Sequence, residues 1–225
     1  FSIIDVSWLD APNLRQYAFK EHEGSYIVGI AAAKASKTGK VGFVGGMDIG
    51  LIRRFACGYV GGVKSVNASA EVYQNMTGTT PAAWNDPAKG AELTQSQIDR
   101  GADVVYHAAG GTGAGVIQAA ADAGKLAIGV DSNQNGMAPG SVLTSMLKRV
   151  DVAAYETFMD AKNGNFSAGV HVLGLAEGGV DWALDENNAS LVTADMKAAI
   201  ESARADIVSG KVKVHDYFSD ESCPY

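Results

Sequence analysis

Residues 101–134 constrain the fold of this chain more than any other stretch. The apolar run Val104–Tyr106 leads into a glycine-rich turn, then into the alanine-rich segment Val116–Ala123, and then into a second apolar run, Leu126–Val130. We interpret this order as strand, turn, helix and strand. Two apolar strands separated by one helix are typical of a parallel sheet that helices cover on both faces.

The loops that follow these two strands are predicted to face one crevice, because they lie at the same carboxyl edge of a parallel sheet. The first loop contains Gly110, and the second begins at Asp131. Glycines let a ligand approach the main chain, and a carboxylate accepts hydrogen bonds from sugar hydroxyls. This combination indicates a site for a small polar molecule. The alternative interpretation is a plain turn, and the dinucleotide fingerprint is absent because Val116 replaces its last glycine.

The same layout of strand, glycine turn and helix occurs at Val41–Val44 and Leu51–Val66, where Arg54 is expected to point outward. Asp86 and Pro87 predict the start of another helix. Further strands are expected at Phe1–Val6, Ala70–Tyr73, Ser141–Met146, Val170–Leu175 and Val212–Val214, and further helices at 21–38, Val150–Ala161 and Ala194–Val208. The alternation of strands and helices predicts an α/β protein.

Composition excludes several functional classes. The 225 residues are 47% hydrophobic and carry a net charge of −7, which argues against a nucleic-acid partner. No run approaches the roughly 20 apolar residues that a membrane-spanning helix needs. The chain begins at Phe1 inside an expected strand, so we expect its amino-terminal part to have been removed or never made. Cys57 is expected to be a buried thiol, and its pairing with Cys223 stays open.

Two further residues are candidates for the crevice. Trp84 stands just before a helix start, where its ring offers a stacking surface, and the alternative is packing against Ile98. Lys148 stands at a strand end, and the alternative is a side chain that extends into solvent. Asp131 and Lys148 have the chemistry of an acid and base pair, but the same two groups equally hold sugar hydroxyls without reaction.

The sequence contains no recognisable catalytic or metal-binding motif. Its four histidines have no metal-ligand spacing, and His107 is expected to be a core histidine although it lies at a strand end. There is no serine nucleophile elbow, and neither cysteine adjoins a base. We therefore predict neither catalysis nor a metal or cofactor.

Several longer motifs resemble the basic membrane protein family of ABC-transporter substrate-binding proteins, also called the purine nucleoside receptor A type. The similarity covers nearly the whole chain. The motifs are FKEHEGSYIVG, VGFVGGMDIGLIRRFACGYVGGVKSVN, WNDPAKGAELTQSQIDRGADVVYHAAGGTGAGVIQAA, IGVDSNQ, VLTSMLKRVD and LAEGGVDWALDE. The resemblance implies a type I periplasmic-binding-protein fold of two lobes, with parallel sheets flanked by helices, that closes on a nucleoside.

The resemblance also implies roles for five residues. Asp131 and Lys148 match positions that hold the ribose hydroxyls. Met47 and Gly110 match positions that line the pocket. Trp84 stands where an aromatic residue covers the base.

By the family layout, residues 1–38 and 172–225 are expected to be the remainder of a first lobe, with residues 39–171 forming the second. About a hundred residues of the first lobe are expected to be missing at the amino terminus. A truncated lobe exposes apolar sheet faces and a strand edge, so we expect a dimer or higher oligomer. Lobe closure is expected to use hinges near Lys37–Lys40 and Met146–Asp151.

The leading hypothesis is an extracytoplasmic binding protein that delivers a purine nucleoside, such as adenosine, guanosine or inosine, to the permease of an ABC importer. The resemblance implies that it lies in the periplasm or is lipid-anchored at the outer face of the cell membrane. One alternative is an enzyme that processes a nucleoside or sugar. Another is a regulatory or surface protein that reuses the fold, because function belongs to the site rather than to the fold.

Overall fold

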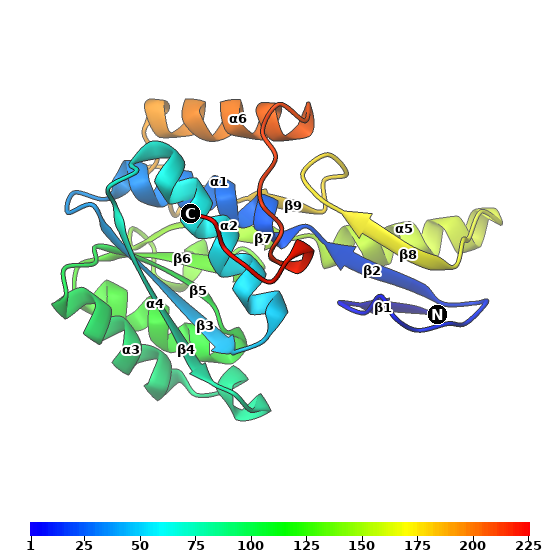
Figure 1. Ribbon diagram of the computed structural model, residues 1–225, viewed down its shortest axis with the longest axis horizontal. Helices are drawn as coiled ribbons and strands as arrows, with labels where there is room; N and C mark the ends of the chain where they lie inside the picture. The colour runs from blue at the N-terminus through cyan, green and yellow to red at the C-terminus, as the bar shows by residue number, and fades with distance from the viewer.

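The computed structural model describes residues 1–225 and contains two β-sheets that lie side by side (Figure 1). The larger sheet has six strands in the order β4 (Glu71–Gly78), β3 (Lys40–Met47), β5 (Val104–Ala108), β6 (Leu126–Asp131), β7 (Val142–Lys148) and β9 (Val180–Trp182). The smaller sheet has three strands in the order β1 (Ser2–Ile4), β2 (Arg15–Phe19) and β8 (Gly169–Leu173). All neighbours are parallel except β7 and β9, so β3, β5, β6 and β7 end at one edge.

Helices cover both faces of the larger sheet (Figure 1). One face carries α1 (Glu21–Ala35) and α2 (Gly50–Val66), and the other carries α3 (Pro87–Asp99) and α4 (Gly113–Asp122). Helix α6 (Ala194–Val208) lies on α1, and α5 (Val150–Asn163) lies beside the smaller sheet. Short 3-10 helices are η1 (Pro81–Trp84), η2 (Gly110–Thr112), η3 (Asn135–Met137) and η4 (Tyr217–Ser219). The predicted α/β class with mostly parallel sheets is confirmed.

The main core lies between the larger sheet and the pair α1 and α2. Phe43, Tyr59 and Tyr106 pack together at its centre; the Phe43 and Tyr106 rings meet edge to face with centroids 5.5 Å apart, and the Tyr59 and Tyr106 rings are tilted with centroids 5.1 Å apart. Strands buried on both faces must be apolar along their whole length, which explains the continuous hydrophobic runs of β5 and β6.

Glycines allow α1 and α2 to cross with their backbones in contact. A Cβ atom added at Gly62 would overlap the carbonyl oxygen of Tyr26 and lie 2.8 Å from its carbonyl carbon. Gly29 and Gly58 have equally close backbone neighbours on the opposite helix. Because no side chain fits between the helices, this crossing fixes α1 against α2.

Two α-helices begin with side-chain caps. The Asp86 side chain accepts a hydrogen bond from the Lys89 N–H at 2.9 Å, and Pro87 occupies the first turn of α3, as predicted. The Thr193 hydroxyl accepts one from the Met196 N–H at 3.1 Å at the start of α6. Each cap satisfies an N–H group that the helix itself leaves free.

The strands differ from the sequence-based expectation at three places. Strands β2 at Arg15–Phe19 and β9 at Val180–Trp182 are not predicted. The expected strand Val212–Val214 is irregular, because this segment crosses between α6 and η4 with no strand beside it.

The predicted residue ranges of the two lobes do not coincide with the two sheets. Helix α1 and strand β9 fall in the ranges given to the first lobe, yet they belong to the larger body. Helix α5 falls in the range 39–171 given to the second lobe, yet it contacts β1 of the smaller sheet. The chain crosses between the bodies after β2, after β7 and after β8. The expected hinge Met146–Asp151 lies at such a crossing, whereas Lys37–Lys40 connects α1 to β3 within the larger body.

The carboxyl-terminal segment, residues 212–225, is fastened to α2. A disulfide joins Cys57 of α2 to Cys223, so the buried Cys57 is not the free thiol expected from the sequence. The Tyr225 ring lies against Gly61, and the Phe218 ring lies against Gly50. The segment therefore runs along α2 as a covalently held strap.

Candidate functional site

A cavity of about 220 Å³ opens at the carboxyl edge of the larger sheet. Four of the five predicted site residues line it, namely Trp84, Gly110, Asp131 and Lys148. Met47 stands at the end of β3 but is not part of the lining. The structure thus brings together residues that are as far as 64 positions apart in the sequence, from Trp84 to Lys148.

Trp84 forms an aromatic wall of this cavity. Its ring lies directly over Gly46, where any larger side chain would collide with it, and is in ordinary contact distance of Gly110. The apolar surface continues with Leu51, Ile52 and Phe55, a set that α2 supplies. Trp84 packs against the main core, whereas Ile98 belongs to a separate cluster, so the alternative contact between the two is wrong.

Asp131 lies at the cavity rim in a left-handed backbone conformation, with φ of 63°. Its turn is held by Gln134, whose side-chain oxygen accepts hydrogen bonds from the Val130 N–H and from His107 Nε2, each at 2.9 Å. A non-glycine residue in this conformation is uncommon and is maintained by its surroundings. Loss of water around the Asp131 carboxyl raises its pKa, and the positive charge of Lys148 only partly opposes this.

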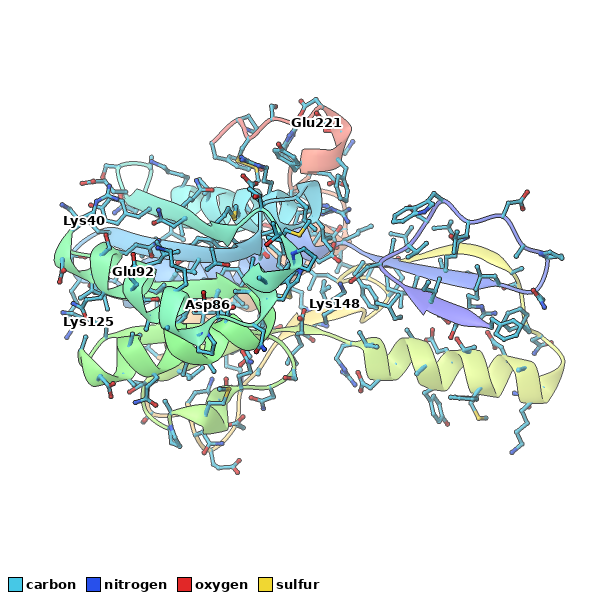
Figure 2. All side chains as sticks on the ribbon, turned by 90° about the horizontal axis from the view of Figure 1, so that it is seen from below. Lys40, Asp86, Glu92, Lys125, Lys148 and Glu221 are labelled. Atoms are coloured by element: carbon cyan, nitrogen blue, oxygen red, sulfur yellow. A yellow bond between two sulfur atoms is a disulfide. The ribbon has the colours of Figure 1, made fainter.

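Lys148 lies at the junction of the two bodies (Figure 2). Its amino group contacts Asp5 Oδ1 at 2.5 Å and Glu21 Oε1 at 3.1 Å, and lies 5.1 Å from the centre of the Phe19 ring. The side chain is only 5% exposed, so the interpretation as a solvent-exposed lysine is wrong. Burial alone would lower the pKa of Lys148, but the carboxylates of Glu21 and Asp5 raise it. Lys148 is therefore a fixed cation in the cavity wall.

Asp131 and Lys148 do not form a direct ion pair. Lys148 is bonded to Asp5 and Glu21, while Asp131 influences it through charge alone. The Asp131 carboxylate is thus left free to accept hydrogen bonds from a ligand, and an ammonium group has a third proton to donate. This geometry suits two neighbouring hydroxyls better than proton transfer between the two residues.

Sequence reasoning missed three charged residues at the site. Asp5 lines the cavity, and Glu21 and Arg54 are buried directly behind it. Arg54, expected to point outward, donates to Glu21 Oε2 at 2.9 Å and to the Phe19 carbonyl oxygen at 2.5 Å. Burial raises the pKa of Glu21, and the charges of Lys148 and Arg54 oppose this. The only local signal for Asp5 was its place at the end of a strand.

His107 is a buried core residue, as predicted. Its ring lies beneath the turn at Gly113, and burial lowers its pKa to about 4. No group of three or more His, Cys, Asp or Glu side chains has an arrangement that would hold a metal ion. None of the helices has both the length and the apolar content to cross a membrane.

Comparison with protein families identifies the chain. Residues 1–217 match the Bmp family, described as ABC transporter substrate-binding protein PnrA-like. The chain belongs to the Bmp family. The resemblance expected from the sequence motifs is thereby confirmed.

Curated relatives of this Bmp chain are longer than the chain itself. The ABC transporter nucleoside-binding protein BmpA of Lactococcus lactis is 36% identical, and the match covers 95% of this chain and 64% of that protein. Basic membrane protein D of Borreliella burgdorferi is 34% identical over 90% of this chain and 59% of that protein. The Bmp chain thus spans less than two thirds of the length of these relatives.

Solved structures resemble the Bmp chain over nearly its whole length. A solute-binding protein of an ABC transporter system from Aeropyrum pernix has a TM-score of 0.84 and 28% identity, covering 94% of this chain and 69% of that chain. A transcriptional activator of the comK gene from Bacillus halodurans has a TM-score of 0.81 at 23% identity, covering 100% and 72%, which shows a shared fold. The Bmp chain thus has the type I fold of periplasmic solute-binding proteins.

Proposed function

We propose that this chain binds a purine nucleoside at the cavity, as part of the substrate-binding protein of an ABC importer, without chemical change to the ligand. The observation that carries the proposal is the convergence of Trp84, Gly110, Asp131 and Lys148 on one cavity. The base would stack on the Trp84 ring, and the ribose hydroxyls would bond to Asp131 and Lys148. The similarity to the nucleoside-binding protein BmpA of Lactococcus lactis supports the same class of ligand.

The charges around the cavity favour a nucleoside over a nucleotide. Asp5 and Asp131 line the cavity and Glu21 lies behind Lys148, so the single cation at the wall is surrounded by carboxylates. A phosphate brought here would meet like charges and find Lys148 already paired. A neutral ligand with hydroxyl donors meets no such penalty.

The binding partner on the membrane would be the permease of the importer, and the protein would act outside the cytoplasm, in the periplasm or anchored by a lipid. This part of the proposal rests on membership of the Bmp family. Ligand would be held between two lobes, of which the smaller sheet and α5 would be part of one.

Isothermal titration with inosine, adenosine and guanosine tests the proposal. Asp131→Ala is expected to weaken binding by about 2–4 kcal/mol, because the ribose loses a charged acceptor and Lys148 loses a neighbouring carboxylate. Asp99→Ala is the matched control, since Asp99 is exposed at the end of α3 and its side chain accepts a hydrogen bond from Gln95 of the same helix. Unchanged affinity in Asp131→Ala would remove Asp131 from the site.

A second comparison uses the ligand instead of the protein. Removing the 2′-hydroxyl is expected to weaken binding, because the site's buried polar groups are then left without a partner. Chromatography of the titrated sample should return the nucleoside intact. Conversion to free base and sugar would instead favour a nucleoside-processing enzyme.

A further inference from the structure

The carboxyl-terminal strap, residues 212–225, delivers a carboxylate to the back of the candidate site. Asp216 accepts two hydrogen bonds from Arg54, at 2.8 Å from Nε and 2.6 Å from Nη2. The centre of the Phe218 ring lies 5.0 Å from the Arg54 guanidinium carbon. Such bidentate pairs fix both the position and the plane of an arginine.

Arg54 extends this contact toward the cavity. Its remaining terminal nitrogen donates to Glu21 Oε2 at 2.9 Å, and Glu21 Oε1 lies 3.1 Å from the Lys148 amino group. Lys148 then contacts Asp5. The result is a row of alternating charges, from Asp216 through Arg54, Glu21 and Lys148 to Asp5, that connects the strap with the cavity wall.

The inner members of this row are shielded from water. The side chains of Arg54, Glu21 and Lys148 are 8%, 1% and 5% exposed. Charges interact more strongly in such surroundings than at a surface, and salt screens them less. A change of charge at Asp216 therefore changes the electrostatic energy of Arg54 and Glu21, and through them that of Lys148.

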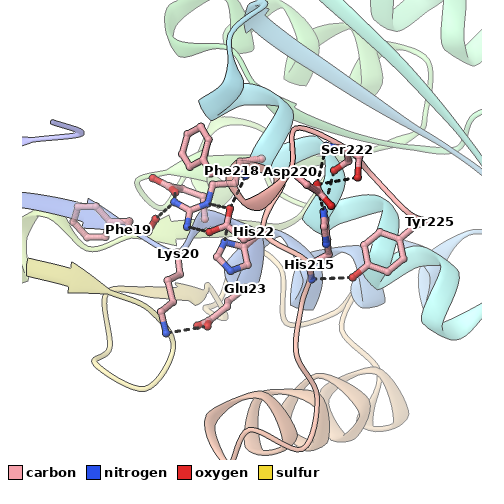
Figure 3. Close-up of polar contacts among 12 residues, drawn as sticks. Phe19, Lys20, His22, Glu23, His215, Phe218, Asp220, Ser222 and Tyr225 are labelled. Carbon is pink, nitrogen blue, oxygen red and sulfur yellow. Dashed lines mark hydrogen bonds and ion pairs between the residues drawn. The ribbon is translucent and has the colours of Figure 1, made fainter. Parts of the chain in front are cut away.

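The strap itself is held independently of this row. The Cys57–Cys223 disulfide attaches it to α2, and the Tyr225 hydroxyl accepts a hydrogen bond from the His215 N–H at 3.0 Å (Figure 3). Asp216 also accepts a hydrogen bond from the Phe218 N–H at 3.1 Å, and an asparagine keeps an oxygen for it. Asp216→Asn should therefore remove the charge and leave the strap in place.

We propose that Asp216 is a positioning residue for Lys148, and that the disulfide-held strap thereby sets the ligand affinity of the cavity. With Asp216 present, Arg54 is shared between two carboxylates, and Glu21 keeps one oxygen for Lys148. Without it, Arg54 draws Glu21 closer, and Lys148 moves toward Asp5 and away from the ligand. The effect on affinity rests on the proposed nucleoside binding, whereas the effect on Lys148 does not.

Titration of inosine into Asp216→Asn tests the effect on affinity. We expect binding about 3- to 10-fold weaker than in the unchanged chain, which lies within the range that mutations in a coupled network of side chains produce. Asp216→Glu, which retains the charge, should recover most of the loss. Glu221→Gln is the matched control, because it removes a charge from an exposed side chain of the same strap.

A double-mutant cycle separates positioning from general loosening of the fold. In a Lys148→Met background, Asp216→Asn should have no further effect on affinity, because the residue through which it acts is gone. An equal loss in both backgrounds would overturn the proposal.

NMR of the lysine side chains tests the row without any ligand. The groups that face Lys148 are Asp5, Glu21 and Asp131, and Arg54 lies behind Glu21. Loss of the Asp216 charge leaves Arg54 less compensated, so the pKa of Lys148 should fall in Asp216→Asn and stay constant in Glu221→Gln. An unshifted Lys148 in a folded Asp216→Asn chain would overturn the inference. A shifted Lys148 without inosine binding in any variant would support the row and count against the proposed function.

Discussion

The crossing of α1 and α2 gives a prediction whose size follows from the geometry. In Gly62→Ala the new Cβ would lie 2.8 Å from the Tyr26 carbonyl carbon and 3.0 Å from its Cα, and both are backbone atoms. Ordinary carbon contacts need about 3.5–4.0 Å, so the helices must separate by roughly 1 Å. Overpacking of this kind costs about 1–3 kcal/mol, and the upper end applies because neither partner can rotate away.

The substitution also gains helix propensity, which must be subtracted from the cost of overpacking. Alanine is about 1 kcal/mol more favourable than glycine inside a helix. We therefore expect Gly62→Ala to lower the free energy of unfolding by about 2 kcal/mol, measured by urea denaturation. This is a large share of the roughly 5–15 kcal/mol that stabilises a typical domain.

Gly61→Ala is the matched control, one position away on the same helix. Its Cβ would meet the ring of Tyr225, 2.6 Å from the nearest ring atom; this residue is 43% exposed, and a ring at the surface can shift more easily than a buried backbone. The helix-propensity gain should then make Gly61→Ala neutral or slightly stabilising. Equal stability of the two variants would refute the reasoning, because it would mean that the α1 and α2 backbones are not in contact.

Three further predictions concern stability and assembly. Replacing both Cys57 and Cys223 with alanine should lower the free energy of unfolding by about 2–5 kcal/mol in urea, because the closed loop spans 166 residues. Burial lowers the pKa of His107 to about 4 from 6.5, so the unfolded chain binds the proton first. Stability should fall by about 1 kcal/mol per pH unit between pH 6.5 and 4, and His107→Gln should reduce this slope. Val170 and Val172 are 47% and 46% exposed on β8, so sedimentation at micromolar concentration should show more than one chain, and lysine at both positions should reduce the mass.

The larger sheet could be predicted well from the sequence because it is buried on both faces. Runs such as Val104–Tyr106 and Leu126–Val130 have to be apolar there, and they are long enough to be recognised. Strand β2 could not be predicted, since it starts with the polar pair Arg15 and Gln16. Both are buried because they find partners elsewhere, and Arg15 contacts Asp160, which lies 145 residues away. No local pattern contains that information.

The candidate site, too, could be predicted only in part from the sequence. Gly110 and Asp131 could be placed in one crevice because both follow parallel strands of the same sheet. Glu21 could not, because an acidic residue in the first turn of a helix is ordinarily a surface residue. Arg54 belongs to an amphipathic helix, and its partners are distant in sequence: Glu21, and Asp216 in the strap, which begins 158 positions later at residue 212. The local hydrophobic pattern contains no information about contacts between residues so distant in sequence.

The Cys57–Cys223 bond turns most of the chain into a closed ring. Everything from the middle of α2 to η4 lies inside this ring, whereas β1, β2 and α1 lie on an open arm that precedes it. A single proteolytic cut within the ring leaves all pieces covalently joined, but a cut before residue 57 releases the arm. The smaller sheet is built from both parts, because β1 and β2 come from the arm and β8 from the ring. Nicked protein would therefore keep its full mass on a nonreducing gel only when the cut lies inside the ring.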